Sequence, residues 1–298
     1  MTTISARSRA SAVRPPAAAL VATSAVSTQL GAALATRLFA QVGPLGALTL
    51  RLVFASAALL VVVRPPVGQI RRTATRRDLA LMAVFGLTLA GMNFSFYEAI
   101  ARVPLGIAVT VEFVGPLTLS IVASRRSADV LWALLAGVGV FLLASGDVLG
   151  TVHGLDMTGM GLALLAGACW AGYIVANKQT GQRFAGTSGL AGAMTIAAAV
   201  VAPLGFATAG TRLLRPEVLA VGLGVAVLSS AGPYSLEMAA LRRVTPRAFG
   251  VLVSMAPAIA ALVGLAVLGQ RLSGTEVVAL ALVVAANVGN AASSGRRP

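Results

Sequence analysis

Charge is scarce in this chain of 298 residues, since Asp, Glu, Lys and Arg together make 11% of it and hydrophobic residues make 57%. Acidic residues are the scarcest, with 9 Asp and Glu against 23 Lys and Arg. A soluble domain covers its surface largely with polar and charged side chains, which this composition cannot supply. The sequence therefore predicts a membrane protein that crosses the bilayer several times, and it excludes an ordinary soluble domain.

Residues for metal, redox or nucleophilic chemistry are also few. The single cysteine, Cys169, excludes an intrachain disulfide, and the single histidine, His153, has only Asp147 and Asp156 near it in the sequence. No phosphate-binding glycine loop, nucleophile elbow or paired-cysteine motif occurs in a usable context. We therefore expect no cofactor, no metal site and no enzymatic activity.

The net charge of +14 comes from basic residues that lie between apolar runs. A nucleic-acid-binding protein gathers such residues on one face beside polar or aromatic side chains, so this distribution argues against nucleic acid. When the connections are assigned alternately to the two sides of a membrane, most basic residues fall on one side, which the positive-inside rule makes cytoplasmic. Both termini are expected there, and Arg7, Arg9 and Arg14 would precede an uncleaved first helix.

Apolar stretches long enough to span a bilayer recur along the whole chain. Taking about 20 residues as one span, we mark ten, near residues 17–38, 44–63, 79–98, 104–123, 130–146, 158–177, 188–207, 218–240, 247–268 and 275–292. The sequence thus predicts an all-α polytopic membrane protein with ten transmembrane helices. Its expected organisation is a cytoplasmic tail at 1–16, a five-helix unit at 17–146, a second at 158–292 and a cytoplasmic tail at 293–298.

The two halves of the chain resemble each other. A shift of 141 residues carries Arg102 onto Arg243 and Pro116 onto Pro257. In both places a connection with arginine precedes a span that has proline at the same depth. Five helices in each half would insert the second copy in the opposite sense, and such inverted repeats are typical of secondary transporters, whose substrate site lies between the repeats.

Glu112 lies near the middle of residues 104–123, a stretch with no other charge. A carboxylate at that depth costs about 2.5 to 3.5 kcal/mol on insertion scales, and intramembrane acids are by default functional. Pro116 lacks an N–H, which leaves the carbonyl of Glu112 for a ligand, a neighbouring helix or water. We expect Glu112 to bind an ammonium group or carry a proton; the alternative is a structural acid inside the bundle.

Arg51 lies inside the second predicted span and cannot be moved into a loop. Its guanidinium needs a carboxylate, backbone carbonyls or a water-filled cavity. Arg51 is therefore a candidate for holding a substrate carboxylate. The structural alternatives are pairing with Glu112 and extension of the side chain toward the membrane surface.

Other polar side chains within the predicted spans are candidates to line a polar cavity, or else form interhelical hydrogen bonds. They are Thr28, Gln29, Asn93, Tyr97, Tyr173 and Asn177. Glu237 lies close to the cytoplasmic end of the eighth span and is a candidate for an intracellular vestibule. Glu98, at the opposite end of the third span, is a weaker candidate.

Prolines interrupt spans in both halves. Pro233 and Pro257 leave the carbonyls of Ser229 and Val253 without helical partners, just as Pro116 does for its own span. Interrupted helices at related depths point to a binding site or a hinge. We take Pro116, Pro233 and Pro257 as candidate hinges.

Four segments resemble a known family. They are VPLGIAVTVEFVGPL at 103–117, PYSLEMAALRRVTPRAFGVLVSMAPAIAALVGLAVLGQRL at 233–272, GACWAGYIV at 167–175 and STQLGAALA at 27–35. They closely resemble bacterial inner-membrane threonine/homoserine exporters of the EamA group, in the drug/metabolite transporter superfamily. The resemblance covers nearly the whole chain. It implies ten helices in two inverted repeats, and export of small neutral amino acids driven by the proton-motive force.

The chain departs from these relatives at two positions. Relatives usually carry glutamate just before the proline of the second repeat and in a pair after it, where this chain has Ala256 and Gln270. Glu112 therefore has no acidic counterpart, which leaves open a different solute, a different coupling or a facilitator. We expect an exporter of threonine-like amino acids that works by alternating access. The alternatives are an exporter of another metabolite or drug, and a non-transporting receptor or scaffold.

Overall fold

The computed structural model describes residues 17–65, 74–122, 127–144, 156–184, 187–233, 236 and 252–293, and within these ranges all regular structure is helical. The α-helices are α1 (Ala17–Thr36), α2 (Phe39–Val63), α4 (Arg76–Ile100), α5 (Leu105–Glu112), α6 (Val114–Val122), α7 (Ser127–Ala144), α8 (Met157–Gly181), α9 (Ser188–Ala209), α10 (Pro216–Ala226), α13 (Ala256–Leu268) and α14 (Gly274–Ser293). A 3-10 helix, η1 (Gly210–Leu214), follows α9, and a π-helical turn, η2 (Val227–Ala231), follows α10.

In the described ranges, α1, α2, α4, α8, α9 and α14 are long and apolar enough to cross a membrane. Shorter apolar helices occur at Leu105–Leu119, Val130–Leu143, Pro216–Ser230 and Ala256–Leu268, where the sequence predicts the fourth, fifth, eighth and ninth spans. The chain is therefore a helical membrane protein with many passes. The number of ten crossings stays a prediction.

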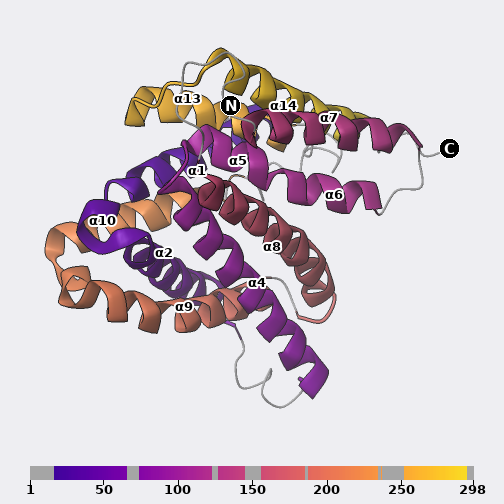
Figure 1. Ribbon diagram of the computed structural model, residues 1–298. Helices are drawn as coiled ribbons and strands as arrows, with labels where there is room; N and C mark the ends of the chain where they lie inside the picture. Colours follow the sequence, from indigo (N-terminus) through magenta and orange to yellow (C-terminus); the bar gives the residue numbers. More distant parts are fainter. Residues whose placement is uncertain are drawn as a thin grey trace, which may run out of the picture.

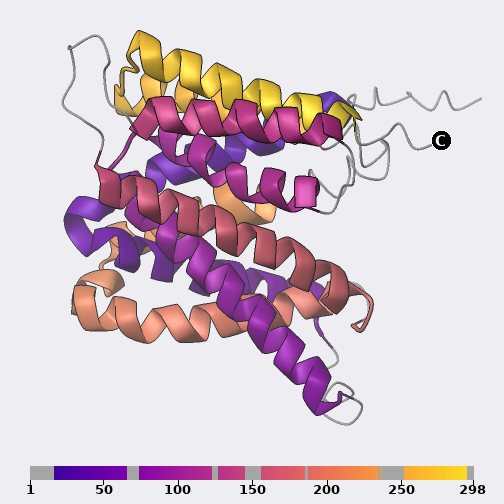
Figure 2. The same ribbon diagram turned by 45° about the vertical axis from the view of Figure 1, so that its right-hand side comes forward.

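The helices form two groups that both views separate clearly (Figures 1 and 2). In one group α7 lies beside α14, and α5 lies beside α13; in the other, α2 lies beside α9, and α4 contacts both of them. Helix α1 contacts α10 and α13, and α8 contacts α4, α5 and α6, so these two helices join the groups. Each group thus contains helices from both halves of the chain.

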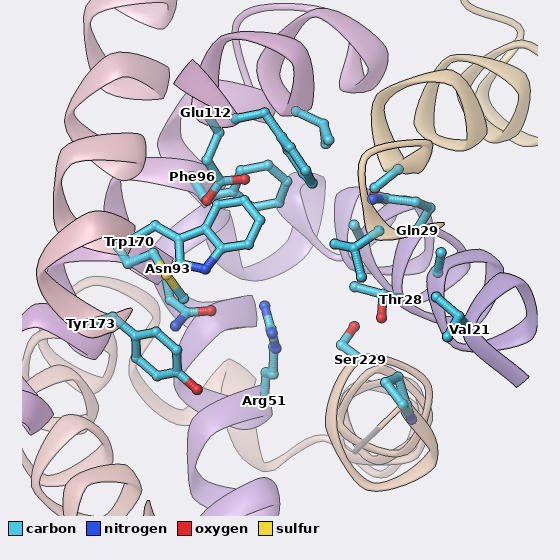
Figure 3. Close-up of a pocket in the computed structure, with 18 residues that line it drawn as sticks. Val21, Thr28, Gln29, Arg51, Asn93, Phe96, Glu112, Trp170, Tyr173 and Ser229 are labelled. Carbon is cyan, nitrogen blue, oxygen red and sulfur yellow. The ribbon is translucent and has the colours of Figure 1, made fainter. Parts of the chain in front are cut away.

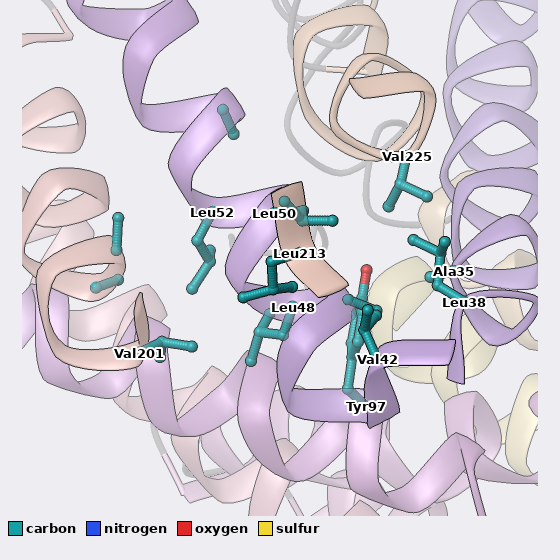
Figure 4. Close-up of a cluster of buried hydrophobic side chains, with 14 of the residues drawn as sticks. Ala35, Leu38, Val42, Leu48, Leu50, Leu52, Tyr97, Val201, Leu213 and Val225 are labelled. Atoms are coloured by element: carbon teal, nitrogen blue, oxygen red, sulfur yellow. The ribbon is translucent and has the colours of Figure 1, made fainter. Parts of the chain in front are cut away.

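Buried apolar side chains fill each group. The cluster in Figure 4 packs Leu48 and Leu52 of α2 against Tyr97 of α4 and Leu213 of η1. A second cluster gathers around Leu105, at the start of α5, together with side chains of α13 and α14. Because lipid is as apolar as these side chains, close van der Waals packing holds such helices together.

Helix α2 begins before the predicted second span and has a kink near its start. Gly43 has φ 70° and ψ 170°, a conformation that a residue with a Cβ rarely adopts, and Pro44 follows it. Helix α2 therefore bends at Gly43 and continues on both sides of this residue.

The fourth predicted span is two helices. Helix α5 ends at Glu112, Phe113 forms a turn, and α6 begins at Val114. Pro116 has no N–H for the carbonyl of Glu112, which accounts for the break. The shift of 141 residues carries Phe113 onto Ser254, and Ser254 likewise forms a turn just before α13.

A register change marks the end of α10. The N–H of Gly232 donates to the carbonyl of Val227, five residues back, and Pro233 has no N–H with which to continue the helix. The resulting π turn widens the helix at Ser229. Such turns are rare and frequently occur at functional sites.

Candidate functional site

A cavity of about 270 Å³ lies where α1, α2, α4, α5, α8 and η2 meet (Figure 3). Its wall therefore comes from both halves of the chain. Of the side chains that the sequence puts forward, Thr28, Gln29, Arg51, Asn93, Glu112 and Tyr173 line this cavity, as does Pro233.

Arg51 of α2 is half-buried and points into the cavity (Figure 3). Its Nη1 donates to the Tyr97 hydroxyl at 3.5 Å, and its guanidinium carbon lies 5.5 Å from the centre of that ring. The Nε of Arg51 is buried and has no hydrogen-bond partner among the described residues. A guanidinium supported in this way and left with a donor unused is suited to binding a carboxylate.

Glu112 is the last residue of α5, and its carboxylate points into the same cavity (Figure 3). In the part of the chain that the structure describes, neither Glu112 nor Arg51 makes an ion pair; the pairs there join Glu98 to Arg102 and Asp78 to Arg183. Pairing of Glu112 with Arg51, one of the structural alternatives, is therefore not what this conformation shows. A basic and an acidic side chain thus face one cavity without pairing with each other.

The backbone carbonyl of Glu112 packs against a neighbouring helix. A Cβ added at Gly167 of α8 would overlap this carbonyl oxygen and would lie 3.2 Å from the nitrogen of Gly115. A Cβ added at Gly115 would in turn overlap the carbonyl of Gly167. This pair of glycines lets the break between α5 and α6 lie directly on α8. Of the three partners predicted for this carbonyl, the structure shows the neighbouring helix.

Aromatic side chains make a large part of the wall. Phe113 and Trp170 meet edge to face, with ring centres 4.8 Å apart and planes at 87°. Phe96 and Tyr173 also line the cavity. A mostly apolar wall with a few polar groups is typical of small-molecule sites. It also strengthens the electrostatic attraction of a ligand to Arg51 and Glu112, because less water screens the charges.

The neutral polar side chains of the wall differ in whether they form hydrogen bonds within the protein. The amide nitrogen of Asn93 donates to the carbonyl of Leu89 at 2.8 Å, and the hydroxyl of Thr28 donates to the carbonyl of Ser24 at 3.0 Å. The hydroxyl of Ser229 is buried and has no hydrogen-bond partner among the described residues. Ser229 is thus a wall residue with an unused polar atom.

Some residues put forward from the sequence lie elsewhere. Tyr97 is fully buried in the cluster of Figure 4 and is behind the wall, where it supports Arg51. Pro116 lies in α6 outside the lining, and Pro257 adjoins the lining residue Ala256. Glu237 lies outside the described residues.

Glu98 and Asn177 do not line the cavity either. Glu98 accepts a hydrogen bond from Arg102 at 2.6 Å in an ion pair at the end of α4, and Asn177 is exposed. Gln270, one of the two departures from the relatives, is also off the wall. Its Oε1 accepts from the backbone N–H of Leu105 at 3.0 Å, so it caps the first turn of α5.

The sequence reasoning missed Trp170 and the hydroxyl of Ser229. Trp170 and Tyr173 are three residues apart, a spacing that puts two side chains on one helix face, so this aromatic pair had a detectable signal. For Ser229 the sequence indicated only a carbonyl without a partner. The position of its hydroxyl depends on the π turn, which no hydrophobic period encodes.

In the described ranges, no group of three or more His, Cys, Asp or Glu side chains is placed to hold a metal ion. The site instead joins a guanidinium, a carboxylate and an aromatic wall in a bundle of apolar helices. A polytopic helical protein whose two halves enclose such a cavity belongs to the class of membrane transporters.

Comparison with known proteins defines the family within that class. The sequence pattern of the EamA-like transporter family matches residues 157–290. The threonine/homoserine exporter RhtA of Salmonella typhimurium strain LT2 is 44% identical over 273 residues, covering 91% of this chain and 90% of that protein. RhtA of Escherichia coli strain K12 is 43% identical over 265 residues, covering 89% and 87%. The chain belongs to the EamA-like transporter family.

A solved crystal structure shares the fold. It aligns with 94% of this chain and 96% of its own, with a TM-score of 0.57 and 20% sequence identity. At this identity the likeness concerns the arrangement of the helices alone.

Proposed function

We propose that this chain exports small neutral amino acids, of the threonine or homoserine kind, across the bacterial inner membrane. The observation that carries the proposal is the cavity in which Arg51 and Glu112 face a common space without pairing with each other. An amino acid brings one carboxylate and one ammonium, so one solute satisfies both residues. The names of the relatives, threonine/homoserine exporters, support the substrate class.

Each charged group has a distinct task. Arg51 takes the substrate carboxylate through Nε and the guanidinium edge that is free of Tyr97. Glu112 takes the ammonium, and the faces of neighbouring rings such as Phe96 and Trp170 add cation–π attraction. Pairing both charges with the ligand offsets the cost of keeping them away from water.

Glu112 also couples export to protons. Its carboxylate binds either an ammonium or a proton, and the two compete for the same oxygens. Release of the amino acid on the outer side lets a proton bind to the carboxylate of Glu112. The transporter then returns to the state that is open to the cytoplasm with Glu112 protonated. One amino acid leaves for each proton that enters through this carboxyl group, so the proton-motive force drives export.

Alternating access follows from two inverted five-helix repeats with both termini in the cytoplasm. The matching breaks at Phe113 and Ser254, with Pro116 and Pro257 three residues after each, support the repeat. Helix α13 follows its break as α6 follows the break at Phe113, and α13 lies against α5 of the first half. Rocking of one repeat against the other at these breaks would open the cavity first to one side and then to the other.

The test is transport by the purified protein in liposomes, with labelled threonine and homoserine and a dye that reports internal pH. We expect threonine flux with opposing proton movement, loss of both in Arg51→Leu, and loss of proton movement in Glu112→Gln. Glu98→Gln removes an acid of the same type outside the cavity and should transport like the parent. Normal coupled transport by both cavity variants would refute the assignment. Flux of none of the amino acids by the parent would refute the substrate class.

A further inference from the structure

Ser229 combines burial, a place on the cavity wall and an unused hydroxyl. It is 7% exposed, it lines the cavity, and its Oγ has no hydrogen-bond partner among the described residues. Figure 3 shows this oxygen on the cavity side of η2. Leaving a buried hydroxyl unpaired is unfavourable. A ligand that brings its own polar group into the cavity would remove that penalty.

Helix α1 holds the backbone of Ser229 in place, although the hydroxyl itself makes no hydrogen bond among the described residues. The hydroxyl of Ser27 in α1 donates to the carbonyl of Leu228 at 2.8 Å, which fixes the π turn to α1. Gly31 of α1 permits the close approach, because a Cβ there would lie 3.0 Å from the nitrogen of Ser229 and would overlap its Oγ. The hydroxyl is therefore positioned before a ligand arrives, which favours selective binding.

Four other polar groups of the wall already have tasks. Arg51 and Glu112 match the carboxylate and ammonium that every neutral amino acid carries, so they cannot distinguish one such solute from another. The hydroxyls and amides of Thr28 and Asn93 donate to backbone carbonyls. A serine hydroxyl donates and accepts at once, and it therefore complements the hydroxyl of another molecule.

We infer that Ser229 binds the side-chain hydroxyl of the substrate and makes the transporter prefer hydroxy amino acids to apolar ones of the same shape. The inference rests on the proposed function and specifies its substrate. A site built to hydrogen-bond a hydroxyl rejects the analogue that lacks it, because its own polar group is then left unpaired. Hydrophobic contact alone discriminates such pairs poorly.

The experiment compares substrates that differ only by a hydroxyl exchanged for a methyl group, threonine with valine and homoserine with norvaline. Affinities come from competition with labelled threonine flux in liposomes, and from the fluorescence of Trp170 in a Trp132→Phe background, because the chain has 2 tryptophans. We expect Ser229→Ala to lower the preference for threonine over valine by about tenfold, the effect of one hydrogen bond. Ser230→Ala, in the same π turn but off the wall, should leave the preference unchanged.

Ser229→Cys keeps the size of the side chain and a weak donor, so it tests the inference if the alanine variant does not fold. It should lose part of the preference. An equal loss of affinity for threonine and valine would overturn the inference. It would mean that the hydroxyl of Ser229 either binds the carboxylate that both amino acids carry or only supports the fold. Threonine transport with an unchanged preference would also overturn it while leaving the proposed function intact. Absence of all amino-acid flux in the parent would overturn both.

Discussion

Replacing Gly167 by alanine tests the contact that positions Glu112. The new Cβ would overlap the carbonyl oxygen of Glu112 and lie 3.2 Å from the nitrogen of Gly115. Both obstacles are backbone atoms, which cannot rotate out of the way as a side chain does. Helix α8 and the break between α5 and α6 would therefore have to move apart, which would displace the carboxylate of Glu112 relative to the cavity wall that α8 supplies.

The magnitude follows from a comparison with Gly161→Ala in the same helix. Gly161 is exposed, and a Cβ there would meet nothing within 4 Å, so alanine should only raise helix propensity, by about 1 kcal/mol. Gly167→Ala gains the same propensity and also suffers overpacking, which costs about 1–3 kcal/mol. The difference between the two variants isolates the overpacking. At about 2–4 °C per kcal/mol, Gly167→Ala should melt roughly 2–12 °C below Gly161→Ala.

The assay is thermal unfolding of both variants in one detergent, followed by threonine binding at a temperature where both are folded. We expect the lower melting temperature and the weaker binding to occur together in Gly167→Ala. Equal shifts in the two variants would refute the close contact between α8 and the break. A lower melting temperature with normal binding would separate the contact from the position of Glu112.

Two further predictions concern helix ends. Gln270→Leu removes the acceptor for the buried N–H of Leu105 and should lower the free energy of unfolding by about 1–3 kcal/mol, whereas Gln270→Glu keeps an acceptor and should melt like the parent. At the start of α8, hydrogen bonds from the backbone N–H groups of Gly159 and Thr158 lower the pKa of Asp156 below its usual 3.8. Its carboxylate therefore stabilises the fold fully above that pH and loses its effect as the pH falls through the lowered value. The difference in melting temperature between the parent and Asp156→Asn, measured by thermal unfolding, should therefore become smaller as the pH falls through this range.

The charged part of the site could be predicted because its signal is local. An arginine or a glutamate inside an apolar run stands out whatever the rest of the chain does, and the cost of burying it demands a cavity or a partner. The cavity gathers Arg51 and Glu112 with Gln29, Asn93 and Tyr173. Prolines are equally local signals, and the break after Glu112 lies where Pro116 predicts it.

The parts of the site that could not be predicted from the sequence depend on which distant segments meet. Asn93 and Tyr97 are four residues apart in α4, and the sequence makes both of them candidates for the cavity. The rotation of α4 that points Asn93 and Phe96 at the cavity turns Tyr97 toward α2, where its hydroxyl meets Arg51. The hydroxyl of Ser229 is a similar case, because its position requires both the π turn and the contact with Gly31.

The charged residues that line the cavity show what the absence of glutamate at positions 256 and 270 changes for a bound solute. Among the described residues that line the cavity, Arg51 and Glu112 are the only basic and acidic residues, and Ala256 is the lining residue at which the resemblance to the exporters leads us to expect glutamate. With alanine there, one positive and one negative group remain, which a zwitterion matches with no charge left over. A second carboxylate at this position would need a proton or another cation whenever a zwitterion was bound. Gln270 lies off the wall at the start of α5, so only the change at Ala256 alters the charge that the solute meets.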